Sequence, residues 1–194
     1  IDTQPKDFNT LVRLSGFSHG TDVWMGNARE LILSGTASVL ETVGCRDDIM
    51  LYLISKGLDP KMSFKIMEKV RKGKVKKGGF DEGWEDAMRE HEVPEWYIES
   101  LAKIGYLFPK AHAVAYVMMA FRIAWYKVHE PLAFYATFFS VRAKAFDAEY
   151  CCAGMAAVKK KIREIENNKD ATAVEQNLLT TLEVCYEFYL RGFH

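Results

Sequence analysis

The sequence lacks cysteine pairs with the spacing of metal ligands or redox sites, and this absence narrows the classes of protein to which it can belong. Its four cysteines are Cys45, Cys151, Cys152 and Cys185, and no two of them form a CxxC motif. This pattern argues against a structural zinc site and favours a reducing compartment. We therefore expect a cytoplasmic protein without disulfide bonds.

The sequence also lacks net charge and a membrane-spanning run. Its 26 lysines and arginines balance 26 acidic residues, so a nucleic-acid partner must be sought in local clusters of charge. The apolar stretch 111–128 is interrupted by His112, Arg122 and Lys127, which makes it too short to span a bilayer. No membrane partner is expected.

The chain opens with Ile1-Asp2-Thr3-Gln4, without an initiator Met or an apolar signal core, so we expect an excised piece of a larger protein.

Alternating strand patterns of useful length and internal repeats are missing too, whereas apolar residues recur at helical spacing, as in Met62, Ile66 and Val70. The sequence predicts an all-α fold, an irregular multi-helix assembly with a C-terminal helical pair. We expect a core over residues 1–146 and the helical pair over residues 147–194. Helices are predicted over 8–14, 24–33, 49–55, 60–72, 84–91, 94–104, 109–129, 132–142, 147–167 and 172–190.

The segment Phe108–Tyr116 contains the most informative local pattern. Pro109 favours the first turn of a helix, and Lys110 and His112 fall in the same turn. Cations at a helix N-terminus oppose the helix dipole, whereas the free N–H groups there suit anions. An anion such as phosphate would offset the unfavourable interaction of these two cations with the helix dipole. The alternative is a solvated lysine and a core histidine on a buried helix.

Two further segments suit phosphate or sugar oxygens. Gly16 is expected to end the first helix, so Ser18-His19-Gly20-Thr21 would be a loop offering hydroxyls, an imidazole and a flexible backbone. The alternative is an ordinary turn between helices. Arg46 precedes the acids of its helix, where acids are preferred, and its alternative role is an ion pair with Asp47, Asp48 or Glu41.

Basic residues are concentrated in one short segment that ends in Gly78-Gly79, and we expect this segment to be a mobile arm. Lys65, Lys69 and Lys72 share one helix face, where like charges cost stability unless an anion such as DNA phosphate faces them. The alternative is a solvated basic face with Glu68 nearby. The basic residues of the segment are Lys69, Arg71, Lys72, Lys74, Lys76 and Lys77.

The sequence offers little support for catalysis within the chain itself. Asp47-Asp48 is the only adjacent Asp pair, and neighbours on a helix diverge by about 100°, so acids that favour a helix start explain the pair better than a metal site does. Ser18-His19 is a poor candidate for a nucleophile and its general base, because adjacent residues rarely have the geometry for that proton transfer. We expect no catalytic residue and no metal ligand in this chain.

Aromatic and basic residues beside the 109–129 helix are candidates for contacts with a nucleotide. Tyr106 and Phe108 are placed to stack on a base, although core packing is the commoner fate of such aromatics. Arg122 follows His112 by almost three helical turns, so the two can lie on roughly the same side.

Three of these motifs occur together in one known family. Residues 14–24 (LSGFSHGTDVW), 45–50 (CRDDIM) and 108–116 (FPKAHAVAY) resemble successive motifs of the PolC-type DNA polymerase III alpha subunits, which are C-family replicative polymerases. Residues 93–98 and 127–131 fit the same pattern, and the resemblance runs in order over about residues 8–146. It implies the fingers region of a DNA-directed DNA polymerase, a nucleotidyltransferase whose palm, absent here, holds the catalytic Mg²⁺ ions.

The resemblance also implies roles and partners. The chain would bind primer–template DNA and a dNTP in cooperation with the palm, thumb and duplex-binding region of the polymerase. Regions absent here would contact the sliding clamp of the replisome. The dNTP-binding residues would be Ser18, His19, Gly20, Thr21, Arg46, Tyr106, Phe108, Lys110, His112 and Arg122. The DNA-binding residues would be Lys65, Lys69, Arg71, Lys72, Lys74, Lys76 and Lys77.

Two other functions remain open on the sequence alone. A stand-alone helical nucleic-acid-binding module would explain the basic segment, although it leaves the zero net charge and the nucleotide-loop motifs unexplained. A small independent hydrolase would use His19 or His112. The polymerase segment accounts for more of the motifs, and the fragment alone is expected to be inactive.

Overall fold

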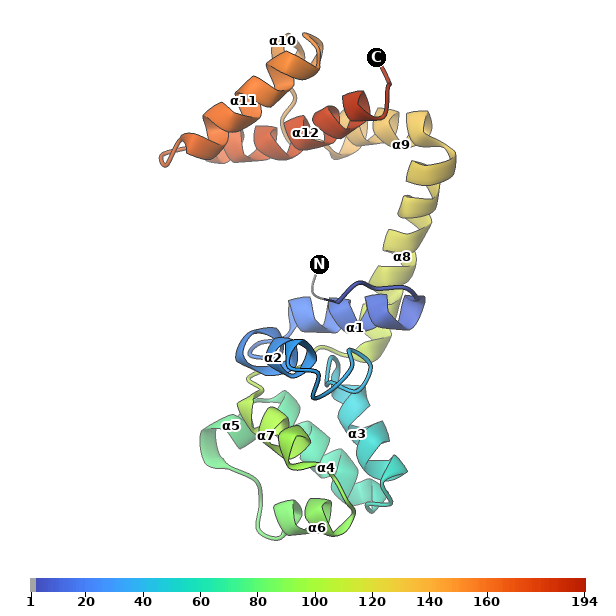
Figure 1. Ribbon diagram of the computed structural model, residues 1–194, viewed down its shortest axis with the longest axis vertical. Helices are drawn as coiled ribbons and strands as arrows, with labels where there is room; N and C mark the ends of the chain where they lie inside the picture. The colour runs from blue at the N-terminus through green and yellow to red at the C-terminus, as the bar shows by residue number, and fades with distance from the viewer. Residues whose placement is uncertain (1–2) are drawn as a thin grey trace. The chain divides into compact units, whose positions relative to one another are not determined.

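The computed structural model describes residues 3–194, so Ile1 and Asp2, which open the sequence without an initiator Met, lie outside the described residues. All regular elements in this range are helices (Figure 1), and the predicted all-α class is confirmed. In chain order they are α1 (Phe8–His19), η1 (Trp24–Ala28), α2 (Arg29–Leu33), α3 (Arg46–Ser55), α4 (Pro60–Arg71), α5 (Lys74–Gly78), α6 (Trp84–Glu90), α7 (Glu95–Lys103), α8 (Lys110–His129), α9 (Pro131–Thr137), η2 (Phe138–Arg142), α10 (Ala148–Cys151), α11 (Met155–Asn167) and α12 (Ala173–Leu190).

Packing divides the chain into a first unit, Ile1–Ala120, and a second unit, Phe121–His194. The division falls within α8, before η2 and the C-terminal helices. The boundary expected between residues 146 and 147 of this chain stays a prediction.

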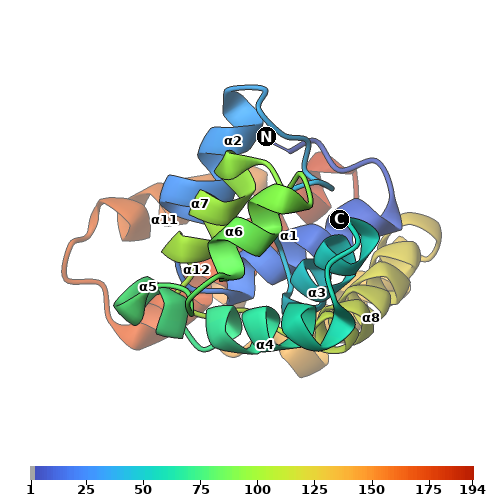
Figure 2. The same cartoon turned by 90° about the horizontal axis from the view of Figure 1, so that it is seen from below.

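The first unit is built around α3, α4 and α7. Ile49, Ile66 and Leu101, one from each helix, have no exposed surface, and α3 and α4 lie side by side (Figure 2). Helix α4 begins as the sequence predicts, because the side chain of Asp59 accepts a hydrogen bond from the Met62 N–H at 2.9 Å and Pro60 is the first helical residue.

The prediction that Gly16 ends the first helix is wrong, since α1 continues to His19. Gly16 is buried, and a Cβ there would lie 2.7 Å from the carbonyl carbon of Gly44 and 2.8 Å from the Cys45 Sγ. Its lack of a side chain therefore serves the close approach of two backbones instead of terminating a helix.

The helix predicted over 24–33 is interrupted. Met25, Gly26 and Asn27 have non-helical dihedral angles, so the chain turns sharply within η1, before α2. The buried Asn27 explains this local break, because its side-chain amide donates to the backbone carbonyls of Asp22 and Ser100, each at 3.1 Å, and so fixes the turn against α7.

The second unit contains the predicted antiparallel pair, α11 and α12, packed through Val158, Ile165 and Leu182. Helix α12 starts with a capping box in which Thr172 and Glu175 bind each other's backbone N–H groups. No helix among residues 3–194 is long and apolar enough to cross a membrane.

Candidate functional site

Three segments that are distant in the sequence meet in the first unit. The Thr21 N–H donates to the Tyr106 carbonyl at 3.0 Å, and the Gly105 N–H donates to the Thr21 carbonyl at 2.9 Å. The Arg46 N–H donates to the Phe108 carbonyl at 3.2 Å. Backbone hydrogen bonds therefore bring the motifs at 18–21, 45–48 and 105–112 together, as a shared site requires.

The end of α1 and the start of α8 form a cluster of flat rings, which we call the imidazole cluster: His19, Phe108, His112 and Tyr116. The ring of His19 stacks on Phe108 at a centroid distance of 4.7 Å, and His112 lies 5.7 Å from Phe108 and 5.7 Å from Tyr116. Both histidines and Tyr116 are exposed. Exposed ring faces of this kind can stack on a nucleobase.

Tyr116 is a member of this cluster that the sequence motifs do not single out as a binding residue. It follows His112 by four residues, so both occupy one face of α8. That spacing is the available signal, but an apolar helix contains many such pairs.

Ser18 and His19 lie in the last turn of α1 instead of the predicted loop. The Ser18 hydroxyl donates to the Ser15 carbonyl at 3.0 Å and lies 2.9 Å from the His19 Nδ1, which is itself 2.9 Å from the Ser15 carbonyl oxygen. Only Gly20 to Asp22 leave the helix. A Cβ on Gly20 would lie 3.1 Å from the Tyr106 carbonyl oxygen, so this residue too permits a close backbone approach.

Lys110 is held by two consecutive carboxylates in the first turn of α3. Its backbone N–H donates to Asp47 Oδ2 at 2.9 Å, and its Nζ lies 3.2 Å from Asp48 Oδ1. The expectation that a bound anion is needed to offset the positive charge of this lysine is therefore incomplete, because Asp48 already supplies a negative charge within the chain.

Asp48, only 8% exposed, connects three parts of the first unit. Besides Lys110, it forms an ion pair with Arg13 at 2.5 Å and accepts the Cys45 N–H at 2.7 Å. We call Arg13, Asp48 and Lys110 the charge cluster. No sequence pattern points to Arg13, which lies in mid-helix and also donates to the backbone carbonyls of Leu40 and Thr42.

A cavity of about 250 Å³ adjoins the charge cluster. Burial, reinforced by the negative charge of Asp48, raises the pKa of the neighbouring Cys45 thiol to about 12, so this thiol is not a nucleophile at neutral pH. The cavity is lined by Asn9, Val12, Arg13, Leu40, Cys45, Asp48 and Lys110.

The residues predicted to bind one nucleotide thus separate into two groups on α8. Lys110 and His112 are two positions apart and point in opposite directions, since each residue turns the helix by about 100°. The Arg46 Nε lies 3.8 Å from Asp47 Oδ2, and Tyr106 is exposed. Arg122 is exposed on the part of α8 that belongs to the second unit.

The prediction of a mobile basic arm is wrong. Apart from Lys72, which caps α4, its basic residues lie in α4 or in the short helix α5, and Val75 of α5 is buried in the core. Several of the cations are paired. Glu68 binds both Arg71 and Lys72, and these hydrogen bonds lower its pKa to about 2.

Ion pairs also engage two other lysines of the segment. Lys69 pairs with Asp81 at 2.7 Å, and Lys76 pairs with Asp22, next to Thr21, at 2.8 Å. Lys65, Lys74 and Lys77 are exposed and have no ion-pair partner within residues 3–194. These three are the cations most available to a polyanion.

Groups of three or more His, Cys, Asp or Glu side chains arranged to hold a metal ion are absent from the described part of the chain. Asp47 and Asp48 are both engaged with Lys110. What this site offers is therefore hydrogen-bond donors, cations and ring faces.

Comparison with known proteins matches residues 1–92 to the family model described as the bacterial DNA polymerase III alpha subunit finger domain. The chain is 56% identical over 99% of its length to the protein named DNA polymerase III PolC-type of Lactococcus lactis subsp. lactis, of which it spans 12%. Identity to the proteins of the same name is 56% in Caldanaerobacter subterraneus subsp. tengcongensis and 55% in Oceanobacillus iheyensis, of which it spans 14% and 13%.

Proposed function

Because the chain belongs to the PolC-type DNA polymerase III family and matches its fingers domain, we propose that it binds the incoming dNTP and primer–template DNA for a replicative DNA-directed DNA polymerase. The chain spans only 12–14% of these relatives, so the activity belongs to the larger protein, which we call the parent polymerase. The fragment alone is proposed to be inactive.

The observation that supports nucleotide binding most directly is the meeting of residues 18–21, 45–48 and 105–112 through backbone hydrogen bonds. The imidazole cluster offers ring faces to a base, and Arg46 and Lys110 offer donors to phosphate. The proposed dNTP-binding residues remain Ser18, His19, Gly20, Thr21, Arg46, Tyr106, Phe108, Lys110, His112 and Arg122.

The proposed role follows from the chemistry of phosphoryl transfer, which depends mainly on positioning and on stabilisation of charge. The Lys110 ammonium has three donors and gives one to Asp48, so two remain for phosphate oxygens. Mg²⁺ would be held by carboxylates of the parent polymerase outside this chain and would stabilise the attacking and leaving oxygens.

The proposed DNA contacts lie on α4 and α5. Lys65, Lys74 and Lys77 would contact phosphates directly, whereas Lys69, Arg71, Lys72 and Lys76 would have to share their charge with the acids that they bind. The proposed partners beyond DNA are the palm, thumb and duplex-binding region of the parent polymerase and the replisome with its sliding clamp, in the cytoplasm.

The test is a Lys110→Ala variant of the full parent polymerase, with Lys103→Ala as a matched control. Lys103 lies at the end of α7 and has no ion-pair partner in the part of the chain that the structure describes. We expect Lys110→Ala to raise KM for dNTP by about tenfold or more, equivalent to about 1.4 kcal/mol, and to leave the Kd for primer–template nearly unchanged. Equal losses in both measurements would contradict the proposed nucleotide role.

The stand-alone nucleic-acid-binding module is the alternative that the unpaired lysines favour. An antibody raised against this chain distinguishes the two on an immunoblot of a cell lysate. A band several times larger than this chain supports the polymerase segment, whereas a single band at the mass of this chain supports the module.

A further inference from the structure

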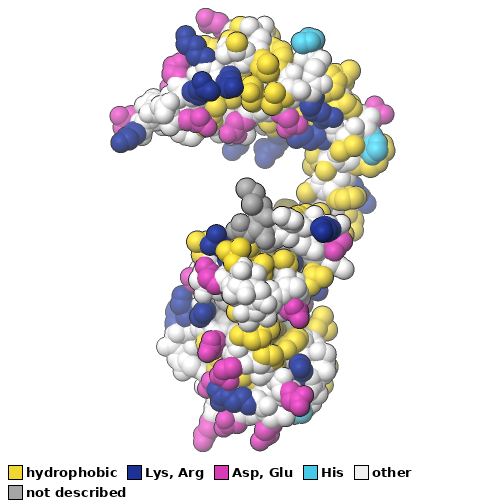
Figure 3. Space-filling view, in the orientation of Figure 1, with side chains coloured by type: hydrophobic (Ala, Val, Ile, Leu, Met, Phe, Trp, Pro, Cys, Tyr) yellow, Lys and Arg dark blue, Asp and Glu magenta, His cyan; other side chains and the backbone are white. Residues whose placement is uncertain are grey.

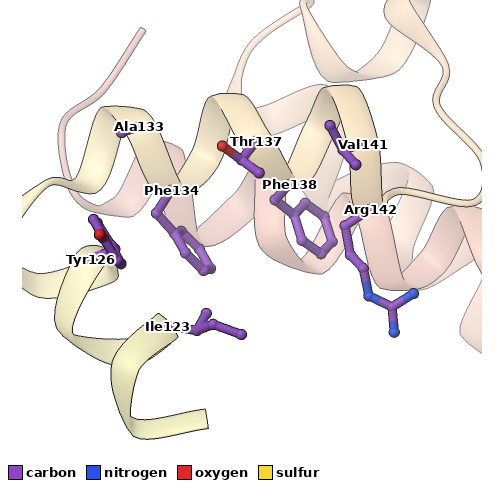
Figure 4. A pocket seen from close by; sticks show the side chains of 8 residues that line it. All are labelled: Ile123, Tyr126, Ala133, Phe134, Thr137, Phe138, Val141 and Arg142. Atoms are coloured by element: carbon purple, nitrogen blue, oxygen red, sulfur yellow. The ribbon is translucent and has the colours of Figure 1, made fainter. Parts of the chain in front are cut away.

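The second unit contains an apolar groove of about 660 Å³ between the end of α8 and the helices α9 and η2 (Figure 4). Phe134, Phe138 and Arg142 project in the same direction from α9 and η2, and the side chain of Ile123 lies beside that of Phe134. All of the lining residues belong to the second unit. They are Ile123, Tyr126, Ala133, Phe134, Thr137, Phe138, Val141 and Arg142.

Helices α9 and η2 are apolar on two faces. One face is already covered by other helices, and the other face lines the groove. On the covered side, Tyr135 is buried and packs against Phe188 of α12 at a centroid distance of 5.1 Å. On the groove side, Phe134, Phe138 and Val141 recur at the spacing of a single helix face. A helix that is apolar on both sides is typical of a protein interior, where each side meets a partner.

Several large apolar side chains of this groove are exposed to solvent, which is unfavourable for an uncovered protein surface. Val141 is 79% exposed, Tyr126 is 54% exposed and Ile123 is 52% exposed. In Figure 3, hydrophobic side chains lie at the surface of the second unit beside lysines and arginines. Large exposed apolar patches with a polar rim mark sites of protein interaction.

We propose that this groove binds an amphipathic helix from the part of the parent polymerase that lies outside this chain; the inference rests on the proposed function. The chain spans 12–14% of its relatives, so most of the polypeptide lies outside it and is tethered to it at a high effective concentration. A concave surface between helices, lined by side chains at helical spacing, suits a helix whose apolar residues also recur every three to four positions.

Charge defines one further property of the bound helix. Arg142 lies at one end of the groove and has no ion-pair partner within residues 3–194. A carboxylate on the bound helix would pair with this guanidinium, preferably through two parallel hydrogen bonds. The bound helix is therefore apolar toward the groove and acidic beside Arg142.

The experiment uses the full parent polymerase with a photo-cross-linking phenylalanine derivative in place of Val141. Val174, which is 68% exposed on α12 and does not line the groove, is the control position. We expect Val141 to give a strong intrachain cross-link to an apolar segment outside these 194 residues, with a yield that does not depend on protein concentration. Cross-links to a second molecule, cross-links to residues 1–194, or a yield no higher than at Val174 would each overturn the proposal. None of these results bears on dNTP binding, which the Lys110→Ala variant tests separately.

A charge exchange tests the acidic partner in the same protein. We expect Arg142→Glu to lower the yield of the Val141 cross-link several-fold, and we expect lysine at the nearest cross-linked acid to restore it. An unchanged yield in Arg142→Glu would overturn the proposed charge pairing. Lys144→Glu, close in sequence but outside the groove, controls for a general effect of charge.

Discussion

The Asp48 carboxylate lies 3.2 Å from the Lys110 ammonium and also binds the guanidinium of Arg13 and the backbone N–H of Cys45. One buried side chain thus fixes α1, the start of α3 and the start of α8 relative to one another. Because Asp47 accepts the backbone N–H of the same lysine, the position of Lys110 depends on α3.

Removal of the Asp48 carboxylate should therefore be strongly destabilising. In Asp48→Ala, two cations and two backbone N–H groups lose their shared acceptor, and loss of one partner from a buried ion pair costs about 3–5 kcal/mol. Urea unfolding of this chain, followed by tryptophan fluorescence, measures the effect. Asp86→Ala removes an acid that is 80% exposed and should change stability by only about 0.5 kcal/mol.

An equal effect of the two substitutions would mean that the charge cluster does not hold the first unit together. Asp48→Asn refines the measurement, because the amide oxygen can still accept the Cys45 N–H but has no charge for Arg13 and Lys110. We expect it to be intermediate between the native chain and Asp48→Ala.

Close backbone packing at Gly16 leads to a second prediction. Alanine normally stabilises a helix relative to glycine by about 1 kcal/mol, but a Cβ on Gly16 would meet Gly44 and the Cys45 Sγ. We expect Gly16→Ala to destabilise the chain by about 1–3 kcal/mol in the same urea experiment. At Gly78 in α5, a Cβ would meet no other atom within 4 Å, so Gly78→Ala should be neutral or slightly stabilising. If Gly16→Ala also stabilised the chain, the close approach of α1 to Gly44 would be wrong.

Features of the fold that depend on residues close together in the sequence can be predicted from the sequence alone. The all-α class, the start of α4 at Asp59-Pro60 and the antiparallel pair α11–α12 follow from apolar spacing and capping residues. The prediction at Gly16 fails because the role of this residue depends on Gly44, which is distant in sequence. A local rule that glycine ends a helix cannot take such a contact into account.

The candidate site shows the same limit. Spacing draws attention to Lys110 but cannot reveal that Asp48, distant along the chain, binds its ammonium, nor that Arg13 joins them. In α5, Val75 is a single apolar residue among lysines, so no pattern indicates that its burial folds this helix against the core.

Glu68 should make the chain sensitive to acid. Hydrogen bonds from Arg71 and Lys72 lower its pKa from an ordinary value of 4.5 to about 2. A carboxyl with a lowered pKa in the folded state contributes stability that is complete above about pH 4.5 and is lost as the pH falls toward 2. Since the group is partly exposed, we expect Glu68→Gln to cost about 0.5–1 kcal/mol at pH 7 and almost nothing at about pH 2. Urea unfolding at both pH values measures this, and a cost that is the same at both would exclude the ionic contribution.

The unpaired lysines of α5 should contribute more to DNA binding than their paired neighbours. Lys74 and Lys77 have no ion-pair partner among residues 3–194, whereas Lys69 and Lys76 each bind an aspartate that a phosphate would have to replace. Removing one lysine–phosphate interaction lowers the magnitude of the slope of log K against log salt by about 0.9 for duplex DNA. In the full parent polymerase we expect Lys74→Ala/Lys77→Ala to reduce this magnitude by about 1.8, with dNTP KM unchanged. The matched variant Lys69→Ala/Lys76→Ala should reduce it less, and the reverse order would mean that DNA displaces Asp22 and Asp81 from their lysines.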